Sequence, residues 1–87
     1  MATTIKDALL DCEKAASDIM DKVDNKLSEN NVSFIHNNKS EIIVENQTKS
    51  NVLDIINSID DVDESTSKLL LQVTESNSNV FIRQKFN

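Results

Sequence analysis

The chain has 87 residues, 38% of them hydrophobic, and a formal net charge of −6, with no glycine, proline, tryptophan or tyrosine. This length predicts one small domain, residues 1–87. So short a chain buries only about 60% of its unfolded surface, which predicts marginal stability unless copies associate. The missing glycine excludes phosphate-binding loops, dinucleotide-binding turns and EF-hands. The acidic charge disfavours direct binding of nucleic acid or of a membrane, because both need a basic surface.

No segment has the pattern of a targeting signal or of a membrane span. The longest apolar runs have three residues, as at 69–71, whereas a span needs about 20. The first residues are polar and do not form the apolar centre of a signal peptide. The single cysteine, Cys12, cannot form an internal disulfide. We therefore expect a cytoplasmic protein.

The first predicted element is an amphipathic helix over about residues 5–28. Its apolar residues recur every three or four positions, as in a helix with one buried face. Asn30 and Asn31 are expected to end it, because asparagine tolerates the left-handed conformation that closes helices. A helix of this length spans about 36 Å, whereas a globule of this chain length is roughly 31 Å across. We therefore expect a homo-oligomer, with a dimer favoured, in which an antiparallel second copy covers the apolar stripe. The interface residues are Ile5, Leu9, Cys12, Ala16, Ile19 and Val23.

Residues 32–45 change to a period of about two, which predicts a β-hairpin. Asn37 and Asn38 are the expected turn, because asparagine accepts a positive φ more readily than other non-glycine residues. In the second strand, Ile42 and Val44 share one face and the residue between them falls on the other.

The helical period returns from about residue 48 and is interrupted by an acidic run at residues 60–64. We expect this run to divide the segment into two helices, with Asp61 capping the second and Glu64 at its third position. One unbroken helix over residues 48–76 is the alternative, which the absence of glycine and proline permits.

The end of the sequence predicts a loop at residues 75–79 and an alternating strand at residues 80–86. The fold class is therefore α+β, with a long N-terminal amphipathic helix, a β-hairpin, one or two helices and a C-terminal strand. A mostly α, coiled-coil-like oligomer is the alternative.

Cys12 and His36 are the only residues of their kinds and could in principle form a nucleophile pair. Cys12 falls within the apolar stripe, however, where a small hydrophobic residue belongs. Two side chains are also too few to hold a metal. We therefore expect no enzyme, no metal site and no cofactor.

The densest group of charges consists of Asp60, Asp61, Asp63 and Glu64. Carboxylates can bind a divalent cation, but these have no ordered ligand spacing. The dipole of a helix also favours acidic residues at its start. We retain the four as a candidate contact for a basic protein partner.

These observations predict a non-enzymatic, self-associating acidic protein that acts by binding another protein. The composition is compatible with a phage or virus accessory protein. One alternative is an acidic inhibitor or nucleic-acid mimic that blocks a nucleic-acid-binding or defence protein. The other is a structural assembly or scaffold component, which predicts large or filamentous assemblies where the inhibitor predicts a discrete oligomer with one stoichiometric partner.

Overall fold

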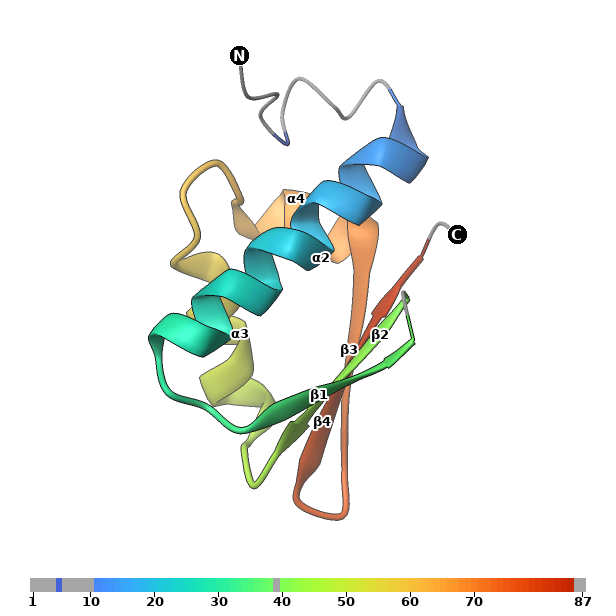
Figure 1. The fold of residues 1–87 in the computed structure, drawn as a ribbon. Coiled ribbons are helices and arrows are strands. Elements are labelled where there is room, and N and C mark those ends of the chain that lie inside the picture. The colour runs from blue at the N-terminus through green and yellow to red at the C-terminus, as the bar shows by residue number, and fades with distance from the viewer. Residues whose placement is uncertain (1–4, 6–10, 39, 86–87) are drawn as a thin grey trace.

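A computed structural model describes residues 5, 11–38 and 40–85. The helices are α2 (Cys12–Glu29), α3 (Lys49–Asn57) and α4 (Glu64–Leu70), and the strands are β1 (Phe34–Asn38), β2 (Glu41–Glu45), β3 (Leu71–Ser76) and β4 (Asn79–Gln84). The three helices lie on one side of a four-stranded antiparallel sheet (Figure 1). The strand order is β1-β2-β4-β3, so β2 and β4 are central and β1 and β3 are edges. The expected α+β class is confirmed.

The N-terminal helix α2 begins at Cys12. Asp11 is extended, with φ −120° and ψ 98°, and its side chain caps the helix by accepting a hydrogen bond from the Lys14 amide. Ile5 is itself helical, but the single helix expected over residues 5–28 is wrong, because Asp11 interrupts it. The 18 residues of α2 span about 27 Å, within the longest molecular extent of 36 Å.

The C-terminus of α2 lies where the sequence predicts it. Asn31 has a φ of 57°, in the left-handed region. Its amide donates to the Ser28 carbonyl at 3.1 Å, and the Val32 amide donates to the Leu27 carbonyl at 3.2 Å. This pair of bonds is the Schellman motif, which satisfies carbonyls at the end of a helix.

The predicted hairpin is present as β1 and β2, but its turn lies further along the chain than expected. β1 continues through Asn38, and the Ser40 amide donates to the Asn38 Oδ1 atom at 2.8 Å. The register shifts between His36 and Asn38. A bulge adds one residue to a strand and moves its end, which is why Asn37 lies within the strand.

The acidic run does separate two helices, so the alternative of one helix over residues 48–76 is wrong. α3 ends at Asn57 and α4 begins at Glu64. The capping residue of α4 is Asp63 and not Asp61, because Asp63 accepts a hydrogen bond from the Thr66 amide at 2.7 Å. Asp61 instead has a φ of 72° in the preceding loop.

The edge strand β3 was not predicted. Its apolar residues Leu71 and Val73 fit either a continuing helix or a strand, and the chain changes to extended geometry at Leu71, with φ −125° and ψ 145°. β3 and β4 are joined through Asn77 and Ser78, whose φ angles are 52° and 68°. Two positive φ angles in a two-residue loop define a type I′ turn, so the loop expected over residues 75–79 is only this turn.

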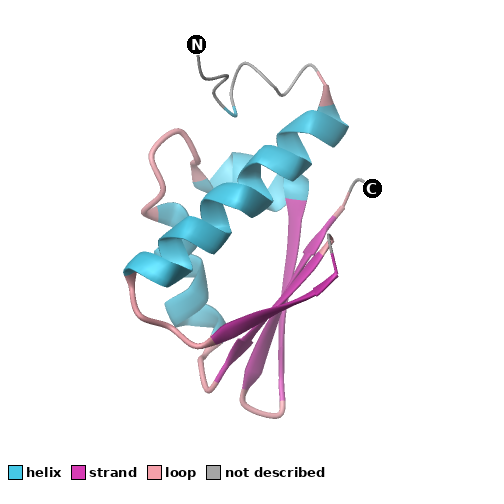
Figure 2. Cartoon of the chain, in the orientation of Figure 1, coloured by secondary structure: helices cyan, strands magenta, loops and turns pink. Residues whose placement is uncertain are grey.

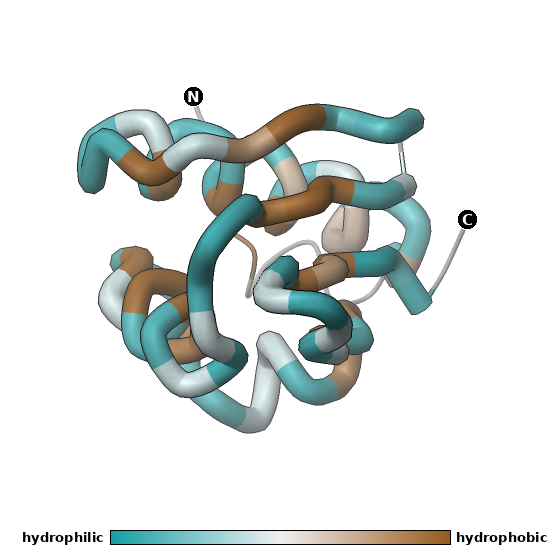
Figure 3. The backbone as a smooth tube through the Cα atoms, turned by 90° about the horizontal axis from the view of Figure 1, so that it is seen from below, coloured by the Kyte–Doolittle hydropathy of each residue, from teal (hydrophilic) through white to brown (hydrophobic). Residues whose placement is uncertain are grey.

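The hydrophobic core lies between the helices and one face of the sheet. From the sheet it takes Ile42, Val44, Val80 and Ile82, all 0% exposed. Figure 3 shows the corresponding pattern, in which hydrophobic brown segments are short and alternate with hydrophilic teal ones.

The predicted oligomer residues Ile5, Ala16, Ile19 and Val23 also belong to this core, at 0% exposure. The same chain therefore covers the part of the apolar stripe that the structure describes. Cys12 is partly buried, and Leu9 lies outside the described residues. A second copy is therefore not needed to cover these residues, although self-association itself stays a prediction.

Candidate interaction surface

The face of the sheet opposite the helices carries a row of three apolar side chains and one threonine. Ile35 pairs with Ile43, Ile43 with Phe81, and Phe81 with Thr74. Opposed residues of antiparallel strands project from the same face, so these four form one line across all four strands, which we call the outer row. Ile35 is 52% exposed and the other three are partly buried. All three described helices lie on the other side of the sheet (Figure 2).

An ion pair borders the outer row at one end of the strands. Glu41 is only 8% exposed. Its Oε1 atom accepts a hydrogen bond from Asn37 Nδ2 at 2.6 Å, and its Oε2 atom accepts one from Arg83 Nε. Both hydrogen bonds lower the pKa of Glu41 below its ordinary value, and the bond from Asn37 has the larger effect. Glu41 is therefore an anion at neutral pH and a fixed partner for Arg83.

Arg83 also contacts the outer row itself. The centre of its guanidinium lies 5.3 Å from the centroid of the Phe81 ring, within cation–π range. Glu41 and Phe81 together hold this cation beside the apolar residues, although Arg83 remains about half exposed.

An exposed carboxylate borders the other end of the outer row. Glu45 lies opposite Asn79, which in turn lies opposite Ser76. The Ser33 hydroxyl donates to Glu45 Oε1 at 3.0 Å. An apolar centre with a polar, partly charged border is the usual anatomy of a protein–protein interface.

The sequence did not identify the outer row as a site. Alternation does assign Ile35 and Ile43 to the faces opposite the core, and the same holds for Phe81. That they lie side by side depends on the order β1-β2-β4, which alternation does not reveal. A usable signal was the run at residues 42–44, because a strand with apolar residues on both faces is typical of one that is covered on both sides.

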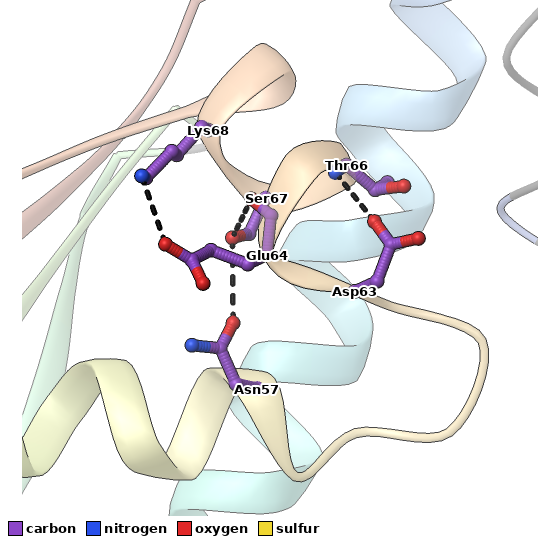
Figure 4. Close-up of polar contacts among 6 residues, drawn as sticks. All are labelled: Asn57, Asp63, Glu64, Thr66, Ser67 and Lys68. Atoms are coloured by element: carbon purple, nitrogen blue, oxygen red, sulfur yellow. Dashed lines mark hydrogen bonds and ion pairs between the residues drawn. The ribbon is translucent and has the colours of Figure 1, made fainter.

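Two of the predicted acidic contacts have local partners in α4 (Figure 4). Asp63 caps the helix. Glu64 pairs with Lys68 at 2.8 Å, and this hydrogen bond lowers the pKa of Glu64. The Ser67 hydroxyl adds a bond to the Glu64 carbonyl at 3.0 Å and lies 3.5 Å from Asn57 Oδ1.

The other two acidic residues lie in the loop before α4. Asp61 accepts a hydrogen bond from the Ile5 amide and so ties this loop to Ile5. Asp60 is exposed and lines a hollow of about 300 Å³ together with Lys22 and Lys26 of α2. Three of the four carboxylates thus take part in contacts within the chain.

His36 and Cys12 do not form the pair that was considered for catalysis. The His36 side chain contacts Asp24 of α2. Asp24 follows Cys12 by 12 positions on the same helix, which is about 18 Å along the axis. The His36 ring also lies edge-on to Phe34, with 6.2 Å between the ring centroids. A hollow of about 540 Å³ lies between α2 and the strands at this place, and its lining includes Met20.

Within residues 5, 11–38 and 40–85, no group of three or more His, Cys, Asp or Glu side chains is arranged to hold a metal ion. No helix in this part of the chain combines the length and the apolar character needed to cross a membrane. Searches of protein-family models, of curated proteins and of solved structures gave no match to the chain. The outer row is therefore interpreted from its geometry alone.

Proposed function

We propose that this chain is a non-enzymatic, cytoplasmic protein that self-associates and acts by binding another protein through the outer row. The observation that carries this proposal is the alignment of Ile35, Ile43 and Phe81 on adjacent strands, on the face opposite the described helices. A partner that covers them removes apolar surface from water, which contributes about 25 cal/mol per Å². Contiguous apolar patches on soluble proteins commonly mark interaction sites.

The charges at the border of the outer row indicate what the partner offers. Arg83 is already paired with Glu41, so its charge is largely compensated. Glu45 is exposed, and the whole chain has a net charge of −6. A partner with an apolar centre and a basic group opposite Glu45 fits this arrangement, since opposite charges steer association and fix orientation.

The alternative of an acidic inhibitor would place the contact at residues 60–64. It draws less support, because local contacts already occupy Asp61, Asp63 and Glu64. The two proposals differ in their response to salt. Contacts between exposed charges weaken as salt screens them, whereas apolar contact does not.

A matched pair of variants tests the outer row. Ile35 and Leu69 are the two exposed large hydrophobic side chains of the described residues, at 52% and 50%. Ile35→Thr removes apolar surface from the row and keeps a β-branched residue in the strand. Leu69→Gln removes a similar surface from α4 and keeps a good helix former. The partner is first captured from the native host on immobilised wild-type protein and identified by mass spectrometry.

Binding of the purified partner is then measured by calorimetry at low and high salt. We expect Ile35→Thr to weaken binding by about tenfold or more and Leu69→Gln to leave it unchanged. Circular dichroism checks that both variants are folded. Equal effects of the two variants, or the absence of a stoichiometric partner, would contradict the proposal. Loss of binding at high salt together with indifference to Ile35→Thr would favour the acidic contact.

A further inference from the structure

β1 is an edge strand whose outer side has no backbone partner among the described residues. The Glu45 amide donates to the Ser33 carbonyl at 2.9 Å, so Ser33 directs its backbone groups towards β2. The pattern of an antiparallel pair repeats every two residues, so Ile35 also faces β2. The amide and carbonyl groups of Phe34 and His36 therefore point away from β2, outward from the edge of the sheet.

The two edges of the sheet differ in how they are protected. β3 carries Glu75, which accepts a hydrogen bond from the Lys49 amide at the start of α3. β1 carries no Asp, Glu, Lys or Arg over its five residues. Proteins usually protect edge strands with charges, prolines or bulges, and β1 has only the bulge beside Asn38. The whole chain has a net charge of −6, so two copies repel each other at most places. Two β1 strands can lie side by side without this repulsion, because neither strand carries a carboxylate.

We propose that β1 pairs antiparallel with β1 of a second copy across a two-fold axis at Ile35, which joins the two sheets into one. In this register Phe34 lies opposite His36 of the second copy. Their outward backbone groups then exchange two hydrogen bonds, and the two-fold axis repeats the exchange. The register is self-complementary, as a two-fold contact requires.

This pairing also covers the most exposed apolar side chain of the strand. Ile35 meets Ile35 of the second copy in the pair without backbone hydrogen bonds, where side chains approach closely. The outer row then continues from one copy into the next. The contact is much smaller than the roughly 1,600 Å² of a standard stable interface, so the dimer is weak. Because both copies are acidic, added salt strengthens the association.

The inference deepens the self-association in the proposed function and rests on it. Amide hydrogen exchange, followed by NMR on the wild-type protein from micromolar to millimolar concentration, tests it without a substitution. We expect the amides of Phe34 and His36 to become protected as concentration rises. Val73 and Glu75, whose amides point outward from the β3 edge by the same alternation, serve as controls and should not change.

A pair of substitutions at His36 provides the second arm. His36→Pro removes the outward amide and leaves the hydrogen bonds between β1 and β2, because the His36 amide does not face β2. His36→Thr removes the same imidazole and its contact with Asp24 but keeps the amide. In sedimentation velocity, His36→Pro should weaken dimerisation by about tenfold or more, and His36→Thr should be close to the wild type.

The possible outcomes separate the inference from the proposed function. A wild-type dimer in which Phe34 and His36 exchange freely overturns the β1 contact and leaves self-association standing. Protection of these amides that requires another protein and not higher concentration also overturns it, since the occupant is then a partner strand. A wild-type monomer at millimolar concentration overturns both the β1 contact and self-association, and it leaves the binding of a partner protein through the outer row standing.

Discussion

Replacing Ser78 by glycine is expected to stabilise the protein. Ser78 occupies the second position of the type I′ turn between β3 and β4, with a φ of 68°. A left-handed conformation costs a non-glycine residue about 1–2 kcal/mol, because Cβ approaches the following carbonyl oxygen. Glycine avoids this contact but loses about 0.5–1 kcal/mol through its greater freedom in the unfolded chain. The expected net gain in the free energy of unfolding is about 0.5–1 kcal/mol.

The melting temperature reports this gain directly. A domain of this size shifts by about 4–8 °C per kcal/mol, so Ser78→Gly should raise the midpoint by roughly 2–8 °C in a thermal scan followed by circular dichroism. The matched control is Ser17→Gly, because Ser17 is exposed and helical in the middle of α2. Glycine there should lower the free energy of unfolding by about 0.5 kcal/mol. If both variants lowered the midpoint, the turn would not have the positive φ angles on which the reasoning depends.

Three further substitutions test the cap, the core and the ion pair. Asp63→Ala should lower the free energy of unfolding by about 1 kcal/mol through loss of the α4 cap, whereas Asp60→Ala should change it by less than about 0.5 kcal/mol, both by urea denaturation. Ile19→Ala, at a position that is 0% exposed, should cost about 2–5 kcal/mol in the same assay. The lowered pKa of Glu41 predicts a contribution to stability that is complete above its ordinary value of 4.5 and is lost as pH falls through the folded-state value. Glu41→Gln should therefore flatten the fall of stability below about pH 4.5, in urea denaturation across pH; an unchanged slope would contradict this.

The sequence predicted the helix ends and strands that depend on residues close to one another along the chain. The end of α2 at Asn30 and Asn31 depends on a conformation that asparagine tolerates. Alternation located β2 and correctly placed Ile42 and Val44 on one face, which the structure shows to be the buried one. The acidic run correctly indicated a break, but its capping residue was misplaced by two positions, because several neighbouring acidic residues can each serve as a cap.

The sequence did not predict β3 or the outer row, because these depend on a turn without glycine and on the order of strands in the sheet. β3 has apolar residues at alternate positions only at Leu71 and Val73, and the turn that follows has serine where glycine usually marks a type I′ turn. Prediction of the outer row would have required the strand order, because Ile43 of β2 lies opposite Phe81 of β4 only when these two strands pair. The predicted need for a dimer through α2 arose from an overestimated helix length, since Asp11 divides that segment.

The order of strands in the sheet also has a consequence for how the chain folds. Each hairpin, β1 with β2 and β3 with β4, joins residues that are close in sequence, and such hairpins form within about 1–10 μs. The central pairing of β2 with β4 brings together Glu45 and Asn79, which are 34 positions apart. Closing a loop of this length costs roughly 3 kcal/mol in chain entropy. With no proline in the chain, no slow isomerisation competes with this step. Refolding should therefore proceed in a single kinetic phase, whose rate is set by the docking of one preformed hairpin against the other.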